Sequence, residues 1–428
     1  MGQDTIFALS TGRPPAAIAI VRLSGPRALE VAEGLAGTRL EPRKATLATL
    51  RCDSQVIDKA LILAFPAPHS QTGEDVAEFH LHGGRAVVEA LAAALVAIPE
   101  VRAAEPGEFT RRAFEHGKID LTGVEGLSDL VLAETETQRR AALQLTGGRL
   151  SRQVADWQER LLMLSARVEA VLDMSDESEV GEALPAGWHE ALGLLIQEFA
   201  QALARPPAER LKDGVRVVIA GPPNSGKSSL LNALTGREAA ITSPIAGTTR
   251  DVLEAPTMIA GVPFLLTDTA GLRDSQDEIE SLGVARAQQR VAEADLLVWL
   301  GEARDRPAQS EALVVESKCD LRAAGERSAE ADLHISAVTG EGLDSLVDLL
   351  VKRAGTLLPR EDEIALNGRH RALLGEGLAS LSDAQSVDDP LIIAESLRNA
   401  LRALDRITGK ANVEDMLDRL FATLCIGK

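Results

Sequence analysis

The chain has 428 residues, of which 45% are hydrophobic and 25% charged, and its formal net charge is −19. This length exceeds what one hydrophobic core supports and predicts two or three domains. The excess of acidic residues argues against a broad basic footprint for nucleic acid, and no apolar run reaches the length of a membrane span. The start of the chain lacks the basic segment of a signal peptide, so we expect a cytoplasmic protein.

Residues 1–120 alternate strand-like and helix-like segments. Ala17–Leu23 and Ala60–Phe65 are short apolar runs that predict buried strands. Val76–Leu81 alternates as a strand does, and a glycine pair then leads into the predicted helix Ala86–Ile98. We expect a compact α/β domain here.

Beyond residue 120 the pattern changes to long stretches with the period of a helix. Such stretches occur at Val124–Gln144, Leu150–Leu172, Ala186–Ala204, Arg369–Leu381, Leu391–Thr408 and Val413–Leu424. Between Ala204 and Arg369 the sequence instead shows strand-like segments and glycine-rich motifs. The predicted domains are therefore an N-terminal domain, a first helical part, an inserted domain and a second helical part, at 1–120, 121–212, 213–355 and 356–428.

The inserted domain carries the string GPPNSGKSS at Gly221–Ser229. It fits the phosphate-loop pattern, in which backbone N–H groups surround the phosphates of a nucleoside triphosphate. Lys227 is expected to reach the β- and γ-phosphates, and the Ser228 hydroxyl to hold Mg²⁺. An apolar strand before the loop and a helix after it support a real site rather than a chance match.

Four further motifs follow in the order found in GTPases. Asp268–Gly271 (DTAG) ends a predicted strand and supplies an acid that can hold Mg²⁺ through water. Thr248–Asp251 lies between, with Thr249 as the second Mg²⁺-binding hydroxyl. Ser317–Asp320 and Ser336–Ala337 end two later strands, and Asp320 can accept paired hydrogen bonds from one edge of guanine. Together these motifs predict a Ras-like GTPase.

Three departures from the common GTPase pattern affect the site. Ser317 stands where the guanine motif normally has asparagine, and loss of one contact with the base would cost about 1 kcal/mol. The connection over residues 301–311 is near the lower limit for a parallel crossover, so its helix must be very short or absent. Leu272 stands where many GTPases have a glutamine that orients water. From the residues alone, Asp274, Asp277, Glu278 and Glu280 are open alternatives for that role.

With these motifs assembled, the chain resembles the tRNA-modification GTPase family MnmE, also called TrmE. The resemblance covers nearly the full length, and it rests on the phosphate loop and on TGEDVAEFHLHGG (Thr72–Gly84), PGEFTRRAFEHGKIDL (Pro106–Leu121), AGTTRD (Ala246–Asp251), DTAGLR with DEIE soon after, SAVTGEGL (Ser336–Leu343) and the terminal CIGK.

The resemblance implies a multidomain α/β plus α fold. This fold has a folate-binding N-terminal domain, a helical domain and an inserted Ras-like GTPase, in a homodimer. It also implies that the chain, with the flavoprotein MnmG, adds a carboxymethylaminomethyl-type group to the wobble uridine (U34) of certain tRNAs. Two alternatives are a regulatory GTPase in ribosome assembly and a folate-dependent one-carbon transferase with a vestigial GTPase.

The resemblance also implies ligand-binding residues. For K⁺ they are Asn224, Ser243, Ile245 and Thr248, and for Mg²⁺ they are Ser228, Thr249 and, through water, Asp268. For GTP they also include Ser225, Gly226, Lys227, Ser229, Pro244, Ala246, Gly247, Thr269, Ala270, Gly271, Ser317, Lys318, Asp320, Ser336, Ala337 and Val338.

The remaining implied residues concern catalysis and folate. Glu280 lies at the position of the family's water-orienting acid, and Arg250 and Arg273 lie in its switch segments. Arg22, Glu78, Lys118 and Lys428 lie where the family contacts 5-formyltetrahydrofolate. The same reasoning brings Cys425 near the folate, either as a reactive thiol or as a buried apolar side chain.

Overall fold

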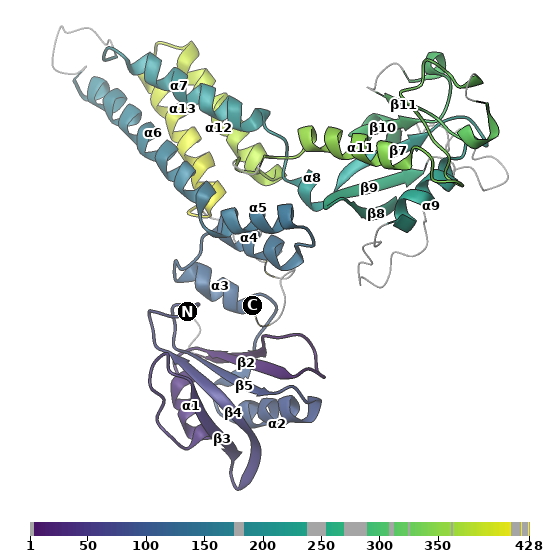
Figure 1. Ribbon diagram of the computed structural model, residues 1–428. Coiled ribbons are helices and arrows are strands. Elements are labelled where there is room, and N and C mark those ends of the chain that lie inside the picture. The colour runs from purple at the N-terminus through teal and green to yellow at the C-terminus, as the bar shows by residue number, and fades with distance from the viewer. Residues whose placement is uncertain are drawn as a thin grey trace, which may run out of the picture. The chain divides into compact units, whose positions relative to one another are not determined.

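The computed structural model describes residues 4–174, 184–237, 254–268, 289–307, 312–323, 326–360 and 363–411, together with Phe421 and Gly427. The chain divides into two compact units (Figure 1). The first, the N-terminal unit, consists of residues 1–128, 145–155 and 405–428, and the second consists of 129–144 and 156–404.

The N-terminal unit contains a six-stranded sheet with the order β3-β4-β5-β2-β1-β6. Its strands are β1 (Thr5–Leu9), β2 (Ile18–Ser24), β3 (Thr46–Cys52), β4 (Gln55–Phe65), β5 (Val76–His82) and β6 (Val101–Ala103). Neighbouring strands are antiparallel except for β1 and β6. The predicted strands β2, β4 and β5 are present, whereas β1, β3 and β6 were not predicted.

Side chains alternate between the two faces of this sheet because successive residues of a strand point in opposite directions. Val21, Leu23 and Phe79 are buried in one core with α1 (Ala28–Ala36) and α2 (Arg85–Val96). Ile6 and Ala8 point to the other face and are buried with Phe109 of α3 (Glu108–Glu115). Helix α3 therefore covers the β1 side of the face opposite α1 and α2 (Figure 1).

The predicted continuous helix over Val124–Gln144 is wrong, because two helices occupy this stretch. They are α4 (Leu121–Leu132) and α5 (Glu136–Thr146). At the start of α5 the Thr135 hydroxyl accepts a hydrogen bond from the Gln138 backbone N–H at 3.0 Å, and the Gln138 side chain accepts one from the Thr135 N–H at 2.9 Å. Such a reciprocal cap begins a new helix even where the apolar periodicity continues.

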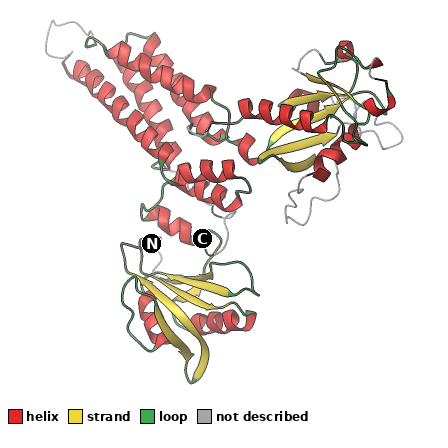
Figure 2. Cartoon of the chain, viewed as in Figure 1, coloured by secondary structure: helices red, strands yellow, loops and turns green. Residues whose placement is uncertain are grey.

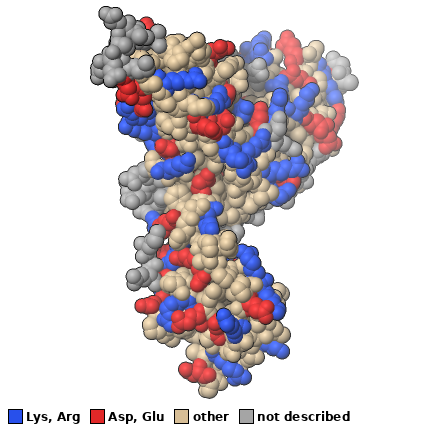
Figure 3. Space-filling model, turned by 90° about the vertical axis from the view of Figure 1, so that its left-hand side faces the viewer, with Lys and Arg blue, Asp and Glu red and all other residues tan. Residues whose placement is uncertain are grey.

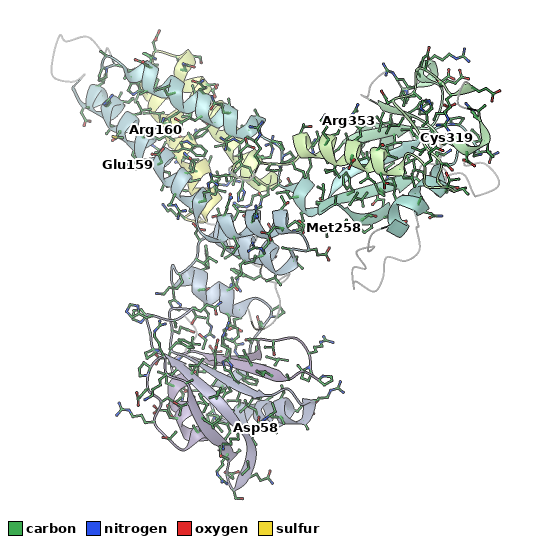
Figure 4. The ribbon with its side chains drawn as sticks, viewed as in Figure 1. Asp58, Glu159, Arg160, Met258, Cys319 and Arg353 are labelled. Carbon is green, nitrogen blue, oxygen red and sulfur yellow. The ribbon has the colours of Figure 1, made fainter. Side chains whose placement is uncertain are left out.

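The helical part of the chain contains long helices in the predicted places (Figure 2). They are α6 (Arg149–Met174), α7 (Trp188–Ala204), α12 (Gly368–Ser386) and α13 (Pro390–Thr408). Trp157 of α6 and Phe199 of α7 pack with ring centroids 4.7 Å apart. Arg160, labelled in Figure 4, pairs with Glu198 at 2.9 Å. The expected helix Val413–Leu424 lies outside the described residues except at Phe421.

The inserted segment forms a second six-stranded sheet with the order β12-β11-β10-β7-β9-β8. Its strands are β7 (Val215–Ala220), β8 (Glu254–Ile259), β9 (Val262–Asp268), β10 (Leu296–Trp299), β11 (Ala312–Glu316) and β12 (Leu333–His334), and its helices are α8 (Glu209–Lys212), α9 (Lys227–Arg237) and α11 (Leu343–Leu357). Only the β8–β9 pair is antiparallel. The short connection after β10 contains a single 3₁₀ turn, Ala303–Asp305, in its described part, as its length predicts.

The carboxyl ends of the parallel strands β7, β9, β11 and β12 meet at one edge of this sheet, where ligands of α/β folds bind. The fold is therefore multidomain α/β plus α, as the sequence predicts. Among the described helices none is long and apolar enough to cross a membrane. On the face drawn in Figure 3, acidic and basic side chains are interspersed, and no single basic field dominates that face.

Candidate functional site

The phosphate loop follows β7 and leads into α9, and its backbone conformation explains its glycines. Gly226 has φ 93°, a conformation that favours glycine, and Asn224 also lies in the left-handed region with φ 60°. A Cβ on Gly221 would lie 2.7 Å from the Leu300 carbonyl oxygen, so the loop sits directly against the end of β10. Only glycine, which has no Cβ, fits there.

Lys227 is buried at the start of α9, with 6% of its surface exposed. Its ammonium donates hydrogen bonds to the carbonyl oxygens of Gly221 at 3.1 Å and Pro222 at 2.8 Å. The charge therefore lies inside the curve of the loop, near the expected position of the phosphates.

The Ser228 hydroxyl donates a hydrogen bond to the Asp268 carboxylate at 2.5 Å. Asp268 ends β9 and is 5% exposed. A hydroxyl and a carboxylate are the oxygen ligands that Mg²⁺ prefers. Ser228, in the first turn of α9, and Asp268, at the end of β9, are predicted to bind the same Mg²⁺ ion, and the structure brings their side chains together.

The guanine loop, residues 317–320, follows β11 and lies against the phosphate loop. The Ser317 hydroxyl donates to the Ser225 carbonyl oxygen at 2.5 Å, and the Lys318 ammonium donates to the Asn224 carbonyl oxygen at 2.7 Å. Asp320 is exposed. The sequence predicts that both motifs serve one nucleotide, and they are in direct contact.

The loop after β12 contains Ser336, Ala337 and Val338, which are predicted to contact the nucleotide. Ser336 is buried, whereas Val338 is 87% exposed. Leu321, next to Asp320, is 77% exposed. Large apolar side chains beside an exposed carboxylate suit the flat, partly apolar surface of a purine.

Cys319, labelled in Figure 4, lies inside the guanine loop and is fully buried. Burial raises the pKa of its thiol, and the nearby charge of Glu341 raises that pKa further. The thiol therefore stays neutral at physiological pH and has a packing role.

Many predicted residues lie outside the described part of the chain. They are Ser243, Pro244, Ile245, Ala246, Gly247, Thr248, Thr249, Arg250, Thr269, Ala270, Gly271, Arg273, Glu280, Cys425 and Lys428. Their roles stay predictions, and so does the complete ligand set of K⁺.

In the N-terminal unit, two of the predicted folate residues form an ion pair on the sheet face opposite α1 and α2. Arg22 of β2 and Glu78 of β5 are register partners, and their charged groups lie 2.8 Å apart. His80 Nε2 lies 3.4 Å from the other Glu78 oxygen. Both members of the pair are about one-sixth exposed, with side-chain exposures of 17% and 16%.

Lys118 lies against Gly73, in the loop before β5. A Cβ on Gly73 would lie 3.1 Å from its Cε, and no hydrogen bond or ion pair within the described residues joins it to Arg22 or Glu78. Gly73 belongs to a loop held to β2, because the Ser24 hydroxyl contacts that of Thr72 at 2.7 Å.

The end of the chain also packs on this unit. The ring of Phe421 lies 6.5 Å from that of Phe114, and the Arg111 guanidinium lies 5.5 Å from the centre of the Phe421 ring. The Ser10 hydroxyl donates to the Gly427 carbonyl oxygen at 2.9 Å. The described tail residues therefore contact the unit that contains the Arg22–Glu78 pair.

A buried charge cluster beside this pair escaped the sequence analysis. Arg112 of α3 is 7% exposed and pairs with Glu74 at 3.1 Å, Asp4 at 3.1 Å and Glu108 at 3.0 Å. Only the Glu108–Arg112 spacing, one helical turn, is visible in the sequence. Arg102 binds both Asp4 and Glu108 as well.

The cluster lowers the pKa of two of its carboxyl groups, those of Asp4 and Glu108. Burial by itself raises the pKa of Glu108, but hydrogen bonds from Arg102, the Glu105 N–H and Arg112 outweigh it and hold that pKa below its usual value. For Asp4, burial likewise opposes the hydrogen bond and charge of Arg102, and the pKa is lowered. These carboxylates are ionised in the folded protein at neutral pH.

Comparison with known proteins agrees with this architecture. A family model described as "GTP-binding protein TrmE N-terminus" matches residues 5–118, and one described as "MnmE helical domain" matches residues 121–425. The chain belongs to the tRNA modification GTPase MnmE family.

Several relatives named "tRNA modification GTPase MnmE" match along the whole chain. Those from Rhizorhabdus wittichii and Zymomonas mobilis are 52% identical over 431 residues and 49% identical over 434 residues. Both alignments cover 100% of this chain, with 97% and 100% of the respective relatives. The MnmE relative from Erythrobacter litoralis is 51% identical over 428 residues, with 100% of both chains covered. The predicted family and the predicted enzyme class, a GTPase, are confirmed.

Proposed function

We propose that this chain hydrolyses GTP at the edge of the second sheet and that hydrolysis serves the modification of tRNA. The observation that carries the proposal is the meeting of the phosphate loop, the Ser228–Asp268 pair and the guanine loop at the carboxyl ends of β7, β9 and β11. A vestigial GTPase does not need to keep Lys227 buried within its phosphate loop.

The hydrolytic site uses two cations. Ser228 and Asp268 fit Mg²⁺, with Thr249 as a further ligand and water between Asp268 and the ion. Asn224, Ser243, Ile245 and Thr248 would hold K⁺. A cation beside the phosphates offsets the charge that develops in the transition state, as an arginine finger does. Arg250 and Arg273 respond to nucleotide state from the switch segments.

Glu280 orients the attacking water in place of the missing glutamine. This role acts on the transition state rather than on ground-state binding. Glu280→Ala is therefore expected to lower kcat about a hundredfold or more, the scale of general base catalysis, with GTP affinity nearly unchanged. Asp277→Ala is the matched control, since it removes a neighbouring carboxylate. Wild-type turnover by Glu280→Ala would assign the role to another group.

Potassium dependence has a direct test. Steady-state hydrolysis is measured in K⁺ and in Na⁺ at the same ionic strength. Fast turnover without an activating protein is expected only in K⁺. Equal rates in the two salts would remove K⁺ from the proposal but would leave GTP hydrolysis in place.

The N-terminal unit binds 5-formyltetrahydrofolate or a related folate. The Glu78 carboxylate suits the donor edge of a pterin, and Arg22, Lys118 and Lys428 suit the anionic folate tail. Ile18 and Leu61 of the same sheet face are 57% and 45% exposed. A second copy of the chain would cover them, which supports the homodimer that the family resemblance implies.

With MnmG, the chain would add a carboxymethylaminomethyl-type group to U34 of certain tRNAs in the cytoplasm. The deciding experiment is the wobble-nucleoside profile of tRNA from cells that lack this chain. Loss of the modified uridine with normal ribosome assembly supports the proposal. Unchanged tRNA with defective ribosomal subunits would instead favour the regulatory GTPase.

Cys425 and the tail have a separate test within this proposal. Deletion of Cys425–Lys428 should abolish tRNA modification and weaken folate binding, with GTP hydrolysis near normal. Cys425→Ser removes the thiol and nearly preserves its size. If Cys425→Ser binds folate but does not modify tRNA, the thiol is reactive. If Cys425→Ser is fully active, Cys425 has only a packing role.

A further inference from the structure

The guanine loop holds the phosphate loop through two neighbouring backbone carbonyls. Ser317 Oγ lies 2.5 Å from the Ser225 oxygen, and Lys318 Nζ lies 2.7 Å from the Asn224 oxygen. Between these contacts a Cβ on Gly226 would lie 3.7 Å from Ser317 Oγ and 3.8 Å from Lys318 Cε. The two loops are thus packed together, with the serine hydroxyl directed at the phosphate loop.

The number of donors on a serine decides what else this hydroxyl can do. A hydroxyl has one O–H donor, and here it is directed to the Ser225 carbonyl. The N7 atom of guanine is an acceptor only and needs a donor from the protein. Ser317 therefore cannot donate to N7 while it holds the phosphate loop. An asparagine amide has two N–H donors and can serve both acceptors.

The guanine loop is also held by contacts with residues 328–335, in and around β12. Glu316, 9% exposed, accepts a hydrogen bond from the Ser328 N–H at 2.9 Å and lies 3.2 Å from His334 Nε2. The Cys319 N–H donates to the Ile335 carbonyl at 3.1 Å. Because the guanine loop is fixed at β11 and β12, the Ser317 contact can restrain the Ser225 end of the phosphate loop.

We propose that Ser317 is a positioning residue that fastens the phosphate loop and that the N7 edge of the base is not read. Base selection then depends on Asp320, which faces the N1–H and 2-amino edge. The site accordingly takes guanine nucleotides and 7-deazaguanine nucleotides equally well. This inference rests on the proposed function and adds to it the ligand class of the same site.

The experiment compares GDP with 7-deaza-GDP, in which a C–H replaces N7, by titration calorimetry on the full chain. The variants are wild type, Ser317→Ala and Ser317→Thr. Thr356→Ala is the control, because Thr356 is an exposed residue of α11 whose hydroxyl donates to the Arg353 carbonyl of its own helix at 2.7 Å. Thermal melts check that each variant is folded.

Wild type is expected to bind the two nucleotides within twofold of each other. Ser317→Ala should lose about fivefold in affinity for both, the effect of one hydrogen bond, because the phosphate loop loses its restraint. Ser317→Thr keeps the hydroxyl and should restore both affinities, and Thr356→Ala should match wild type.

Two results would overturn the inference. One is wild type binding 7-deaza-GDP several-fold more weakly than GDP, with the difference abolished in Ser317→Ala, since the serine would then contact N7. The other is Ser317→Ala with both affinities unchanged, since the contact would then restrain nothing. Failure of wild type to bind GDP at all would instead reject the GTPase proposal itself.

Discussion

The phosphate loop and the Arg112 cluster both bind basic side chains, but through different acceptors. Around the phosphate loop the ammonium groups of Lys227 and Lys318 bind backbone carbonyls. In the N-terminal unit Arg112 binds the carboxylates of Asp4, Glu74 and Glu108. One region is held by groups that every residue has, and the other by ionisable side chains.

The two kinds of acceptor respond differently to change. A backbone carbonyl accepts hydrogen bonds at any pH and survives substitution of its side chain, so only the donor can be removed. A carboxylate titrates, and loss of either partner leaves a buried charge unpaired. The contacts of Lys227 and Lys318 with backbone carbonyls should therefore be insensitive to acid, whereas the contacts of Arg112 should weaken as its carboxylates are protonated.

Lys227→Ala should have the largest effect on the nucleotide side. It removes the cation expected at the β- and γ-phosphates, and charge-assisted contacts of this kind contribute about 3 kcal/mol or more, a loss of at least about a hundredfold in GTP affinity. Titration with a fluorescent GTP analogue measures this. Lys352→Ala, on the exposed surface of α11, is the control. Normal affinity in Lys227→Ala would remove the lysine from the phosphate site.

Arg112→Met should have the largest effect on the N-terminal unit. It removes the cation that pairs with Glu74, Asp4 and Glu108 and leaves Arg102 to bind Asp4 and Glu108 alone. Breaking a buried pair costs about 3 kcal/mol in free energy of unfolding. Hydrogen exchange of peptides from β1 and α3 reports on it. Arg111→Met, one residue away but 39% exposed in its pair with Glu115, should cost less than about 1 kcal/mol. Equal effects of the two substitutions would contradict a special role for the cluster.

Acid should weaken the Arg112 cluster of the N-terminal unit. Because the folded-state pKa values of Glu108 and Asp4 are lowered, their contribution to stability is complete above the unfolded values of about 4. The contribution is lost as the pH falls below 4 through the folded values. Circular dichroism melts from pH 6 to pH 3 should show this loss as a falling melting temperature. In Glu108→Gln the melting temperature should depend less on pH. The same pH dependence of the melting temperature in wild type and Glu108→Gln would contradict a contribution of the Glu108 carboxylate to stability.

Ser317→Asn is expected to have the smallest effect and sharpens the nucleotide side of the comparison. The amide offers a second donor for the base and should tighten GDP binding by up to about 1 kcal/mol. Asp320→Asn should weaken guanine preference much more, since it removes the acceptor for two N–H groups. Calorimetry that finds no gain for Ser317→Asn would mean that N7 already has a partner.

The same contrast explains what the sequence predicts well. The phosphate site is predictable because its loop requires a short contiguous motif with glycines at fixed positions between a strand and a helix, as at Gly221–Ser229. The Arg112 cluster is not, because Asp4 and Glu74 lie 108 and 38 residues away from Arg112. The break between α4 and α5 was missed because the cap at Thr135 interrupts the helix without interrupting its apolar periodicity.

The Ser10–Gly427 contact has a consequence for the order of synthesis. The N-terminal unit contains the first and the last residues of the chain, and a Cβ on Gly427 would lie 2.3 Å from the Leu9 carbonyl oxygen, so the fit is close. A ribosome that makes about 5–20 residues per second finishes the intervening chain roughly 15–60 s after the first sheet has emerged. The first unit to begin folding is thus among the last to be completed, and a chain that stops early never acquires its Gly427 contact.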